Sequence, residues 1–448
     1  TVQIVCSRPK ADLLSIWIPI LPEHMWKNVN PQLAGKSYAV KLPLVGTGPF
    51  QCVAFKQGEY AEMVANKQYF RGAPHIDEII FENYTSADTM AQDLLGGTID
   101  AAQGVPPAQF GAVSRTPGLT AVAYNYRNWD YLSMNCYTQP ASKGNPVLKD
   151  ARFRQALNWA IDRQKLVALA WSGRAQVGTT ILPPGEWVHP DYHWQPPADT
   201  AYGYDPQKAA QLLDEAGFRD TDGNSVREAH GKPIVLRLWA DSASVENQSE
   251  AKLIAGYLKK VGLGIRLTIM DGGAMTDRVW NSSGNTYAPD FDLYVWAWEG
   301  YFDPGQTMAS FTTAQIGGWN EPCWSNAEYD RLAAQQAVTV DSTKRQQIIW
   351  RMQQIMYAES PEIVLTYPRY LQAYDSGGWT GWTRIFNGTG PAFAMGFPET
   401  YLNLRPIAAS ATHGRSTLWI AVVALAAAAF VGLVLWLVLR ARRKLVEE

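Results

Sequence analysis

The feature that most constrains this chain is an uninterrupted apolar run near its C-terminus, Leu418 to Leu439. At about 1.5 Å rise per residue, a helix over this run would cross the roughly 30 Å hydrocarbon core of a bilayer and satisfy its own backbone groups there. A tail rich in arginine and lysine, residues 440–448, follows it directly. By the positive-inside rule, the pattern predicts one transmembrane helix at 418–439, a basic cytoplasmic tail at 440–448 and an extracytoplasmic domain before them.

The composition of the chain argues against some classes of partner. Charged residues make up 18% and the formal net charge is −2, so no basic surface predicts nucleic-acid binding. The 18 Trp and 21 Tyr exceed what a core requires and are typical of ligand-binding clefts. A chain of this length is too long for one compact core, which predicts two lobes.

The four cysteines, Cys6, Cys52, Cys136 and Cys323, are widely separated and show no zinc-ligand spacing. Disulfides form outside the cytoplasm, but the sequence does not choose among the pairings. The chain opens TVQIVCSRPK, without an apolar signal-peptide region. An extracytoplasmic domain needs an export route: either the apolar run at 418–439 alone directs insertion, or the true N-terminus precedes Thr1. A Thr in place of Met at position 1 favours the second.

The middle of the chain shows an alternation of helix and strand patterns. Asp150 predicts the N-cap of a helix that closes at Gly173, and Asp205-Pro206 predicts the start of another that ends at Gly217. Further ranges with strand or helix periodicity are 234–239, 249–261, 265–269, 291–296, 328–337, 344–358 and 363–367. This alternation predicts an α/β lobe with helices covering the faces of a sheet.

The segment 291–304 is the strongest candidate for a site. A predicted strand runs into a loop that carries Trp296, Trp298 and Tyr301 together with the carboxylates of Glu299 and Asp303. Ligands of open α/β sheets bind beyond the carboxyl ends of strands, and the two tryptophans share one face while the strand lasts. Core aromatics beside a solvated turn remain an alternative, as does a glycosidase-like carboxylate pair formed by Glu299 and Asp303.

Two groups of residues bear on metal binding. Asp220 to Asn224 (DTDGN), with Glu228, resembles part of a calcium loop, but the full EF-hand spacing is absent, which favours a plain Asp/Gly turn. His189 and His193 lack an evident third ligand. We predict neither a metal site nor a cofactor.

Several blocks of sequence together resemble a known family. They are LVGTGPF at 44–50, NKQYFRGAP at 66–74, LLGGTID at 94–100, LSMN at 132–135, DARFRQA at 150–156 with AIDR at 160–163, YDP to AGF at 204–218, and residues 296–304. In this order they resemble the extracellular solute-binding proteins of peptide-type ABC importers, often called family 5. The resemblance extends over residues 1 to about 385 of the chain.

The resemblance implies a fold class: α/β, with a two-lobe periplasmic-binding-protein-like (type II) fold and a hinge, to which the apolar run adds one C-terminal transmembrane helix. It also implies that the chain is truncated at its N-terminus within the first lobe. The expected parts are the remainder of lobe I at 1–130, the solute-binding lobe II at 131–367, a return to lobe I at 368–405, a linker at 406–417, the transmembrane helix at 418–439 and the cytoplasmic tail at 440–448.

The resemblance also implies where the ligand binds. Relatives hold the amino group of a peptide through an acidic residue in a loop that reads W-x-W-x-G-D-x-D-P; here Tyr301 occupies that acidic position, flanked by Glu299 and Asp303. The expected ligand-binding residues are Asn135, Tyr137, Trp296, Trp298, Glu299, Tyr301 and Asp303.

From the resemblance we expect a receptor without catalytic activity, which closes two lobes around a small solute, an oligopeptide, and delivers it to ABC permease and ATPase subunits. It would lie on the extracytoplasmic face of the cell membrane, held there by the C-terminal helix. The alternatives are the same fold with an oligosaccharide or a metal chelate, an anchored glycoside hydrolase that uses Glu299 and Asp303, and a sensor that signals ligand occupancy to a membrane partner.

Overall fold

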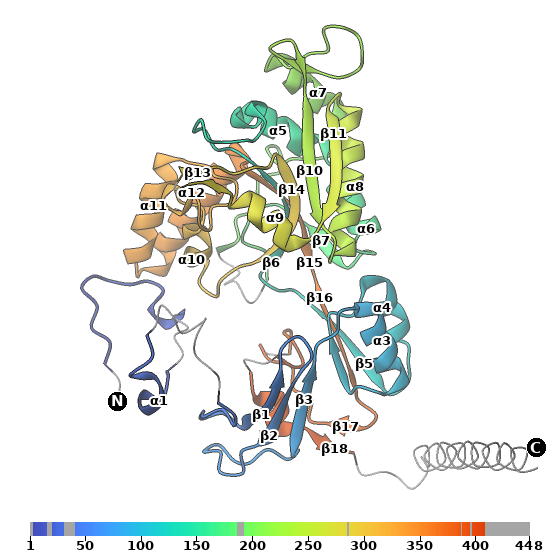
Figure 1. Cartoon of the computed structure of the whole chain (residues 1–448), viewed down its shortest axis with the longest axis vertical. Coiled ribbons are helices and arrows are strands. Elements are labelled where there is room, and N and C mark those ends of the chain that lie inside the picture. Colours follow the sequence, from blue (N-terminus) through green and yellow to red (C-terminus); the bar gives the residue numbers. More distant parts are fainter. Residues whose placement is uncertain are drawn as a thin grey trace, which may run out of the picture.

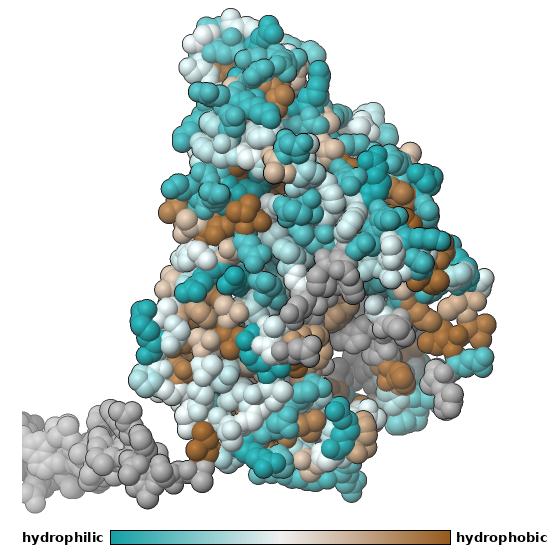
Figure 2. All heavy atoms as spheres, turned by 180° about the vertical axis from the view of Figure 1, so that it is seen from behind, coloured by the Kyte–Doolittle hydropathy of each residue, from teal (hydrophilic) through white to brown (hydrophobic). Residues whose placement is uncertain are grey.

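The computed structural model describes residues 3–15, 20–30, 41–185, 192–284, 286–386, 388–394 and 397–407 of this chain. In Figure 1 these residues form a larger and a smaller α/β lobe, joined by strands that run from one into the other. The opposite face, in Figure 2, is mainly hydrophilic, with small and separate groups of apolar side chains.

The larger lobe is built on a six-stranded mixed sheet in the order β11-β10-β14-β6-β15-β7. Its strands are β6 (Asn128–Met134), β7 (Ala175–Val177), β10 (Val235–Asp241), β11 (Gly264–Met270), β14 (Leu293–Glu299) and β15 (Glu362–Pro368). β11, β10 and β14 are parallel, whereas β6 is antiparallel to both β14 and β15. The carboxyl ends of β14 and β15 and the start of β6 therefore meet at one edge of the sheet.

Helices cover both faces of this sheet (Figure 1). They are α5 (Ala151–Ala160), α6 (Arg163–Leu169), α7 (Pro206–Glu215), α8 (Val245–Lys260), α9 (Gly272–Val279), α10 (Pro304–Ala309), α11 (Ala327–Val338) and α12 (Ser342–Glu359). Most begin at a side chain that accepts a hydrogen bond from a first-turn N–H group, as Asp150 does from Arg152 and Asp205 from Lys208. Short hairpins, β8 (Glu228–Ala229) with β9 (Lys232–Pro233) and β12 (Ser282–Ser283) with β13 (Thr286–Tyr287), complete the lobe.

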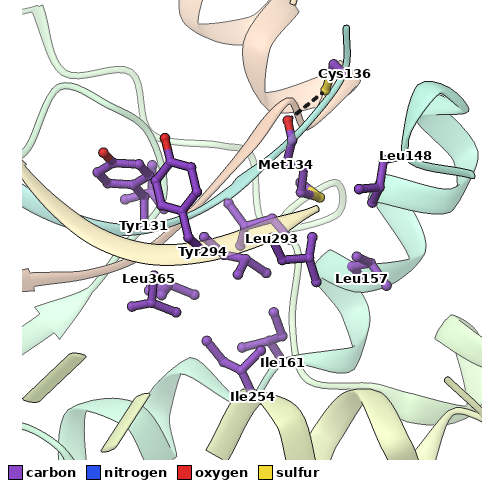
Figure 3. Close-up of a cluster of buried hydrophobic side chains, with 14 of the residues drawn as sticks. Tyr131, Met134, Cys136, Leu148, Leu157, Ile161, Ile254, Leu293, Tyr294 and Leu365 are labelled. Carbon is purple, nitrogen blue, oxygen red and sulfur yellow. Dashed lines mark hydrogen bonds between the residues drawn. The ribbon is translucent and has the colours of Figure 1, made fainter. Parts of the chain in front are cut away.

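The main core lies between the sheet and these helices. In Figure 3, Leu293 and Leu365 of the central strands face Ile161, directly after α5, and Ile254 of α8. The hydroxyl groups of Tyr131 and Tyr294 point away from this side. Both tyrosines are fully buried and donate hydrogen bonds to the carboxylate of Glu321.

The smaller lobe contains two three-stranded antiparallel sheets. One has the order β1-β2-β3, and the other has the order β4-β16-β5 with α3 and α4 packed against it. The elements are β1 (Phe50–Lys56), β2 (Tyr60–Ala65), β3 (Glu78–Glu82), α3 (Ala87–Gly96), β4 (Ala101–Gln103), α4 (Pro107–Val113), β5 (Leu119–Tyr124) and β16 (Tyr370–Asp375). Near them lie β17 (Trp379–Thr380), α13 (Glu399–Asn403) and β18 (Arg405–Pro406), and α1 (Glu23–Trp26) lies near the N-terminus.

The chain crosses twice between the two sheets β4-β16-β5 and β11-β10-β14-β6-β15-β7. It leaves β5 at Tyr124 and enters β6 at Asn128, and it leaves β15 at Pro368 and enters β16 at Tyr370. Both crossings are very short and lie next to each other, since β6 pairs with β15. This geometry is that of a hinge between two lobes.

One part of the predicted fold class is corrected by the structure. In the described part of the chain, no helix is both long enough and apolar enough to cross a membrane. The longest of them, α12, carries lysine, arginine and glutamine in successive turns, and hydrocarbon does not solvate these groups. The segment predicted to span the membrane, 418–439, lies outside the described residues, as do the predicted tail and most of the linker. The described residues form a two-lobe α/β fold, and none of their helices is the predicted transmembrane helix.

Individual elements agree with the sequence patterns to different degrees. α7 begins after Asp205 with Pro206 in its first turn, as predicted. The single helix predicted from Asp150 to Gly173 is wrong: it is divided into α5 and α6, because Asp162 caps a new helix start. The boundaries predicted for the lobes stay predictions.

Candidate functional site

The carboxyl end of β14 lies at the crossing between the lobes. Glu299, the last residue of β14, stands opposite Asn128, the first residue of β6. The second crossing follows β15 at the same edge of the sheet. Ligands of open α/β sheets bind at such edges, which makes this the candidate site.

Glu299 contacts residues from both crossings. Its Oε1 accepts hydrogen bonds from the Tyr126 hydroxyl at 3.1 Å and from Arg127 Nη2 at 2.7 Å, and its Oε2 accepts one from the Tyr370 hydroxyl at 3.2 Å. Tyr126 and Arg127 belong to the first crossing, and Tyr370 begins β16 after the second. One carboxylate from the larger lobe thus contacts both chain segments that connect the two lobes.

The two charges of this ion pair differ in their exposure. The side chain of Arg127 is 8% exposed, whereas that of Glu299 is 43% exposed. Arg127 lies over the rings of Tyr126 and Phe302, at 4.4 and 3.9 Å from their centroids, and also donates to the carbonyl oxygen of Gly300. The charge that an incoming ligand can reach is therefore the carboxylate of Glu299.

Three tyrosines form an aromatic cluster beside this carboxylate. The ring centroids of Tyr126 and Tyr370 are 4.7 Å apart, and Tyr124 lies 5.7 Å from Tyr370. Burial raises the pKa of Tyr126 to about 12, and burial together with the charge of Glu299 raises the pKa of Tyr370 as well. Both hydroxyl groups consequently stay protonated and remain donors at neutral pH.

The two tryptophans of β14 occupy different surroundings on the same face. Trp298 packs near Trp129, Phe311 and Trp319, with ring centroids 5.6, 5.3 and 6.3 Å away, and is stacked on Trp319. Trp296 is half-buried, and its ring meets the edge of Tyr294 at 6.0 Å. Trp298 is thus part of a packed aromatic group, while Trp296 has fewer aromatic neighbours.

Asp303 is buried, and its carboxylate is engaged inside the protein. It caps α10 through Gly305 N at 2.8 Å and Gln306 N at 3.3 Å. It also pairs with both terminal nitrogens of Arg345, at 2.8 and 2.5 Å. The side chains of this ion pair are only 6% and 7% exposed.

The other predicted site residues lie further along the strands. Asn135 is buried at the end of β6, where its amide group donates to Phe291 O at 2.9 Å and accepts from Tyr137 N at 3.1 Å. Tyr137 is half-buried and packs against the ring of Tyr287. Tyr301 is exposed, and its backbone N–H donates to Thr307 Oγ1. The seven predicted positions therefore do not converge on a single point, and their assignment to a ligand stays a prediction.

Three residues of this arrangement were not predicted from the sequence: Tyr126, Arg127 and Tyr370. The only local signal was the aromatic-rich run YNYRNWDY at 124–131, which has no strict alternation. Tyr126 and Glu299 are 173 positions apart, so only the strand register brings them together.

The described residues of the two groups considered for metal binding do not contact Glu299. Asp220, Asp222 and Glu228 each offer a carboxylate oxygen, and these oxygens lie within 4.8 Å of one another. His193 binds the carbonyl oxygen of Leu182 through Nδ1 at 2.6 Å, and His189 lies outside the described residues. The four cysteines are free thiols in the structure.

Comparison with known proteins places this geometry in a family. Residues 1–319 match the family described as bacterial extracellular solute-binding proteins, family 5 Middle. The chain is 27% identical over 351 residues to the oligopeptide-binding protein AppA of Bacillus subtilis (78% of this chain, 61% of that protein). It is also 27% identical over 380 residues to the glutathione-binding protein GsiB of Salmonella paratyphi A (84% of this chain, 68% of that protein).

Solved structures support the fold. AppA from Bacillus subtilis, in complex with a nonapeptide, has a TM-score of 0.70 at 24% identity, covering 87% of this chain and 72% of that one. NikZ from Campylobacter jejuni, in complex with Ni(L-His), has a TM-score of 0.69 at 22% identity, covering 84% and 71%.

The chain spans only 61% of the length of the Bacillus relative. The family match nevertheless extends over most of this sequence, and the two-lobe architecture agrees with it. The chain belongs to the bacterial extracellular solute-binding proteins, family 5.

Proposed function

We propose that this chain is the ligand-binding component of an ABC importer and that its ligand is a peptide, bound outside the cytoplasm. Relatives carry the names oligopeptide-binding, glutathione-binding and di/tripeptide-binding protein, which favours peptides over sugars. In this proposal the protein binds and releases its ligand unchanged.

The observation that carries the proposal is the position of Glu299. Its carboxylate is partly exposed, lies at the carboxyl edge of the sheet and touches both crossings between the lobes. A peptide has an α-ammonium group, and a carboxylate accepts charge-assisted hydrogen bonds from such a group. Glu299 would replace the acidic residue that relatives carry at the position of Tyr301.

Some of the remaining predicted residues would contact the part of the ligand beyond its amino group, and the others would support the segment that carries Glu299. Trp296 and Tyr301 are partly exposed on the segment that carries Glu299, and aromatic side chains bury apolar ligand surface while keeping a polar edge available. Asp303, Asn135 and Trp298 would support this segment from inside.

Ligand binding would couple to the hinge through Glu299. A ligand that contacts both lobes in a closed form, and only one in an open form, shifts the equilibrium towards closure. The permease and ATPase subunits of the importer would then recognise the closed form, which makes delivery depend on occupancy.

Calorimetric titration of the chain with a tripeptide tests the proposal. We expect binding of the free peptide, and Glu299→Gln should weaken it about 10- to 100-fold, because a charge-assisted hydrogen bond contributes about 1.5–3 kcal/mol. Acetylation removes the positive charge of the peptide's amino group. The affinity of the wild-type chain for the N-acetylated peptide should therefore be no higher than the affinity of Glu299→Gln for the free peptide. Glu215 is an exposed residue of α7. Glu215→Gln is therefore the matched control and should leave the peptide affinity unchanged.

Native mass spectrometry of the purified chain identifies the ligand class without choosing a peptide in advance. Co-purified peptides would support the proposal. A bound sugar or a metal chelate would overturn the peptide assignment, and equal affinity of Glu299→Gln and wild type would overturn the role of Glu299.

A further inference from the structure

We propose that the loop Asp220 to Glu228 (DTDGNSVRE) is a calcium site, separate from the ligand site at Glu299. The loop follows α7 and leads through the β8–β9 hairpin to β10. In Figure 1 this segment forms the end of the larger lobe that is remote from the crossings between the lobes.

Three carboxylates gather in this loop. An oxygen of each of Asp220, Asp222 and Glu228 lies within 4.8 Å of the others, a spacing at which one cation can contact all three. None of the three forms an ion pair within the described part of the chain. Three like charges this close repel one another unless a cation lies between them.

Glu228 supplies an independent observation. It is only 6% exposed, and its Oε2 accepts hydrogen bonds from Thr221 N at 2.7 Å and Thr221 Oγ1 at 2.9 Å. Its other oxygen, Oε1, is buried and has no hydrogen-bond partner in the described structure. A buried carboxylate oxygen without a partner is costly, and a bound cation that contacts this oxygen would remove that cost.

The arginines close to the loop are directed elsewhere. Arg227 pairs with Asp214 at 2.5 Å and donates to Val261 O at 2.7 Å, and Arg219 donates to Asp214 O at 3.1 Å. Lys259 and Lys260 line the same hollow as Asp220, but the structure shows no ion pair between them and the three carboxylates. The N–H groups of Gly223, Asn224 and Ser225 donate to the carboxylates of Asp220 and Asp222, but no cationic side chain of the described residues forms an ion pair with them.

The donor set matches calcium better than other common metals. Asp220, Asp222 and Glu228 offer only hard oxygen atoms, and no His or Cys belongs to the cluster. Calcium accepts flexible arrangements of oxygen ligands, whereas magnesium requires near-ideal octahedral geometry. Extracellular calcium modules bind with dissociation constants on the order of 10⁻⁴ to 10⁻³ M, and we expect this range.

The test is a titration of the chain with CaCl₂, followed by calorimetry and by thermal unfolding. We expect binding of one calcium ion per chain and a rise of the unfolding midpoint with calcium that EDTA reverses. Asp222→Asn should weaken calcium binding about tenfold or more, because it removes one charged ligand. Asp222 is exposed, so this variant is expected to fold as the wild type does.

Asp277→Asn, an exposed aspartate on α9, is the matched control and should bind calcium as the wild type does. Absence of calcium binding at about 5 mM, well above the expected range, would overturn the proposal. Equal calcium affinity of Asp222→Asn and wild type would overturn it as well. Peptide binding at Glu299 is measured separately, so failure of one proposal does not affect the other.

Discussion

Glu299 and Asp303 are two carboxylates of one loop with different environments. Glu299 is partly exposed and contacts both chain crossings between the lobes, whereas Asp303 is buried against Arg345 and the N-terminus of α10. Residue type and spacing in the sequence do not distinguish them. Their burial and their partners do, and this difference can be measured.

We predict that Asp303→Ala destabilises the larger lobe by about 3–5 kcal/mol, because Arg345 would remain buried without its partner. Urea unfolding followed by tryptophan fluorescence measures this change. Glu215→Gln, an exposed position on α7, serves as the control and should leave the unfolding midpoint nearly unchanged. If Asp303→Ala kept full stability and lost peptide binding, Asp303 would be a ligand contact instead.

Alanine substitutions of the two tryptophans of β14 should differ in their effects on stability and on peptide binding. Trp298→Ala removes the centre of an aromatic group and should cost about 2–4 kcal/mol of stability, somewhat less than a fully buried tryptophan would. Trp296→Ala should weaken peptide binding at least about fivefold with a smaller loss of stability. Thermal unfolding and calorimetric titration of both variants test this. Unchanged affinity in Trp296→Ala would remove that residue from the proposed site.

At the scale of elements, the contact between β6 and α8 contains two buried acids. Asp130 of β6 accepts a hydrogen bond from Asn247 at 3.1 Å, and Glu250 of α8 accepts bonds from Trp171 at 3.0 Å and Thr366 at 3.1 Å. Burial raises the pKa of Glu250 to about 7. Burial, and next the charge of Glu250, raises the pKa of Asp130.

This pair predicts how stability depends on pH. Because the pKa of Glu250 is higher in the folded than in the unfolded chain, the folded state binds more protons between about pH 4.5 and 7. The contribution of Glu250 to the free energy of unfolding is therefore complete at low pH and is lost as the pH rises through about 7. This contribution is on the order of 3 kcal/mol at most.

Urea unfolding at pH 5, 6, 7 and 8, compared between wild type and Glu250→Gln, isolates this contribution. The variant should show a flatter dependence on pH over this interval, while Glu215→Gln, an exposed control, should follow the wild type. Identical pH dependence in Glu250→Gln and wild type would contradict the prediction.

At the scale of the whole molecule, two short crossings connect the sheets of the two lobes, and Glu299 touches both. A peptide that binds there should favour a closed arrangement. Small-angle scattering should then show a smaller radius of gyration with the free tripeptide. The N-acetylated tripeptide at the same concentration should produce little change. An unchanged radius at saturating free peptide would show that binding and closure are not coupled.

The sequence by itself determined the elements whose causes are local. α7 follows from Asp205, Pro206 and the glycine at 217, and the helix of α3 ends at Gly97, which adopts a positive φ. Four strands of the six-stranded sheet, β10, β11, β14 and β15, overlap their predicted ranges, because apolar runs bounded by turn residues mark buried strands. The order of motifs along the chain was also sufficient to identify the family.

Tertiary structure alone decided the features that depend on distant residues. β6 was not predicted as a strand, because NWDYLSM contains a charged residue and shows no alternation when both faces are buried. Its Asp130 is tolerated only through α8.

The candidate site was likewise predictable only in part from the sequence. The residue types at 296–303 predicted a ligand-binding loop, but not that Glu299 would face Tyr126 and Tyr370 while Asp303 turned inward to Arg345. Helix caps and turns depend on interactions within a few residues, so the sequence determines them directly. The partners of a buried or half-buried carboxylate depend on strand register and burial, which arise only when distant segments pack together.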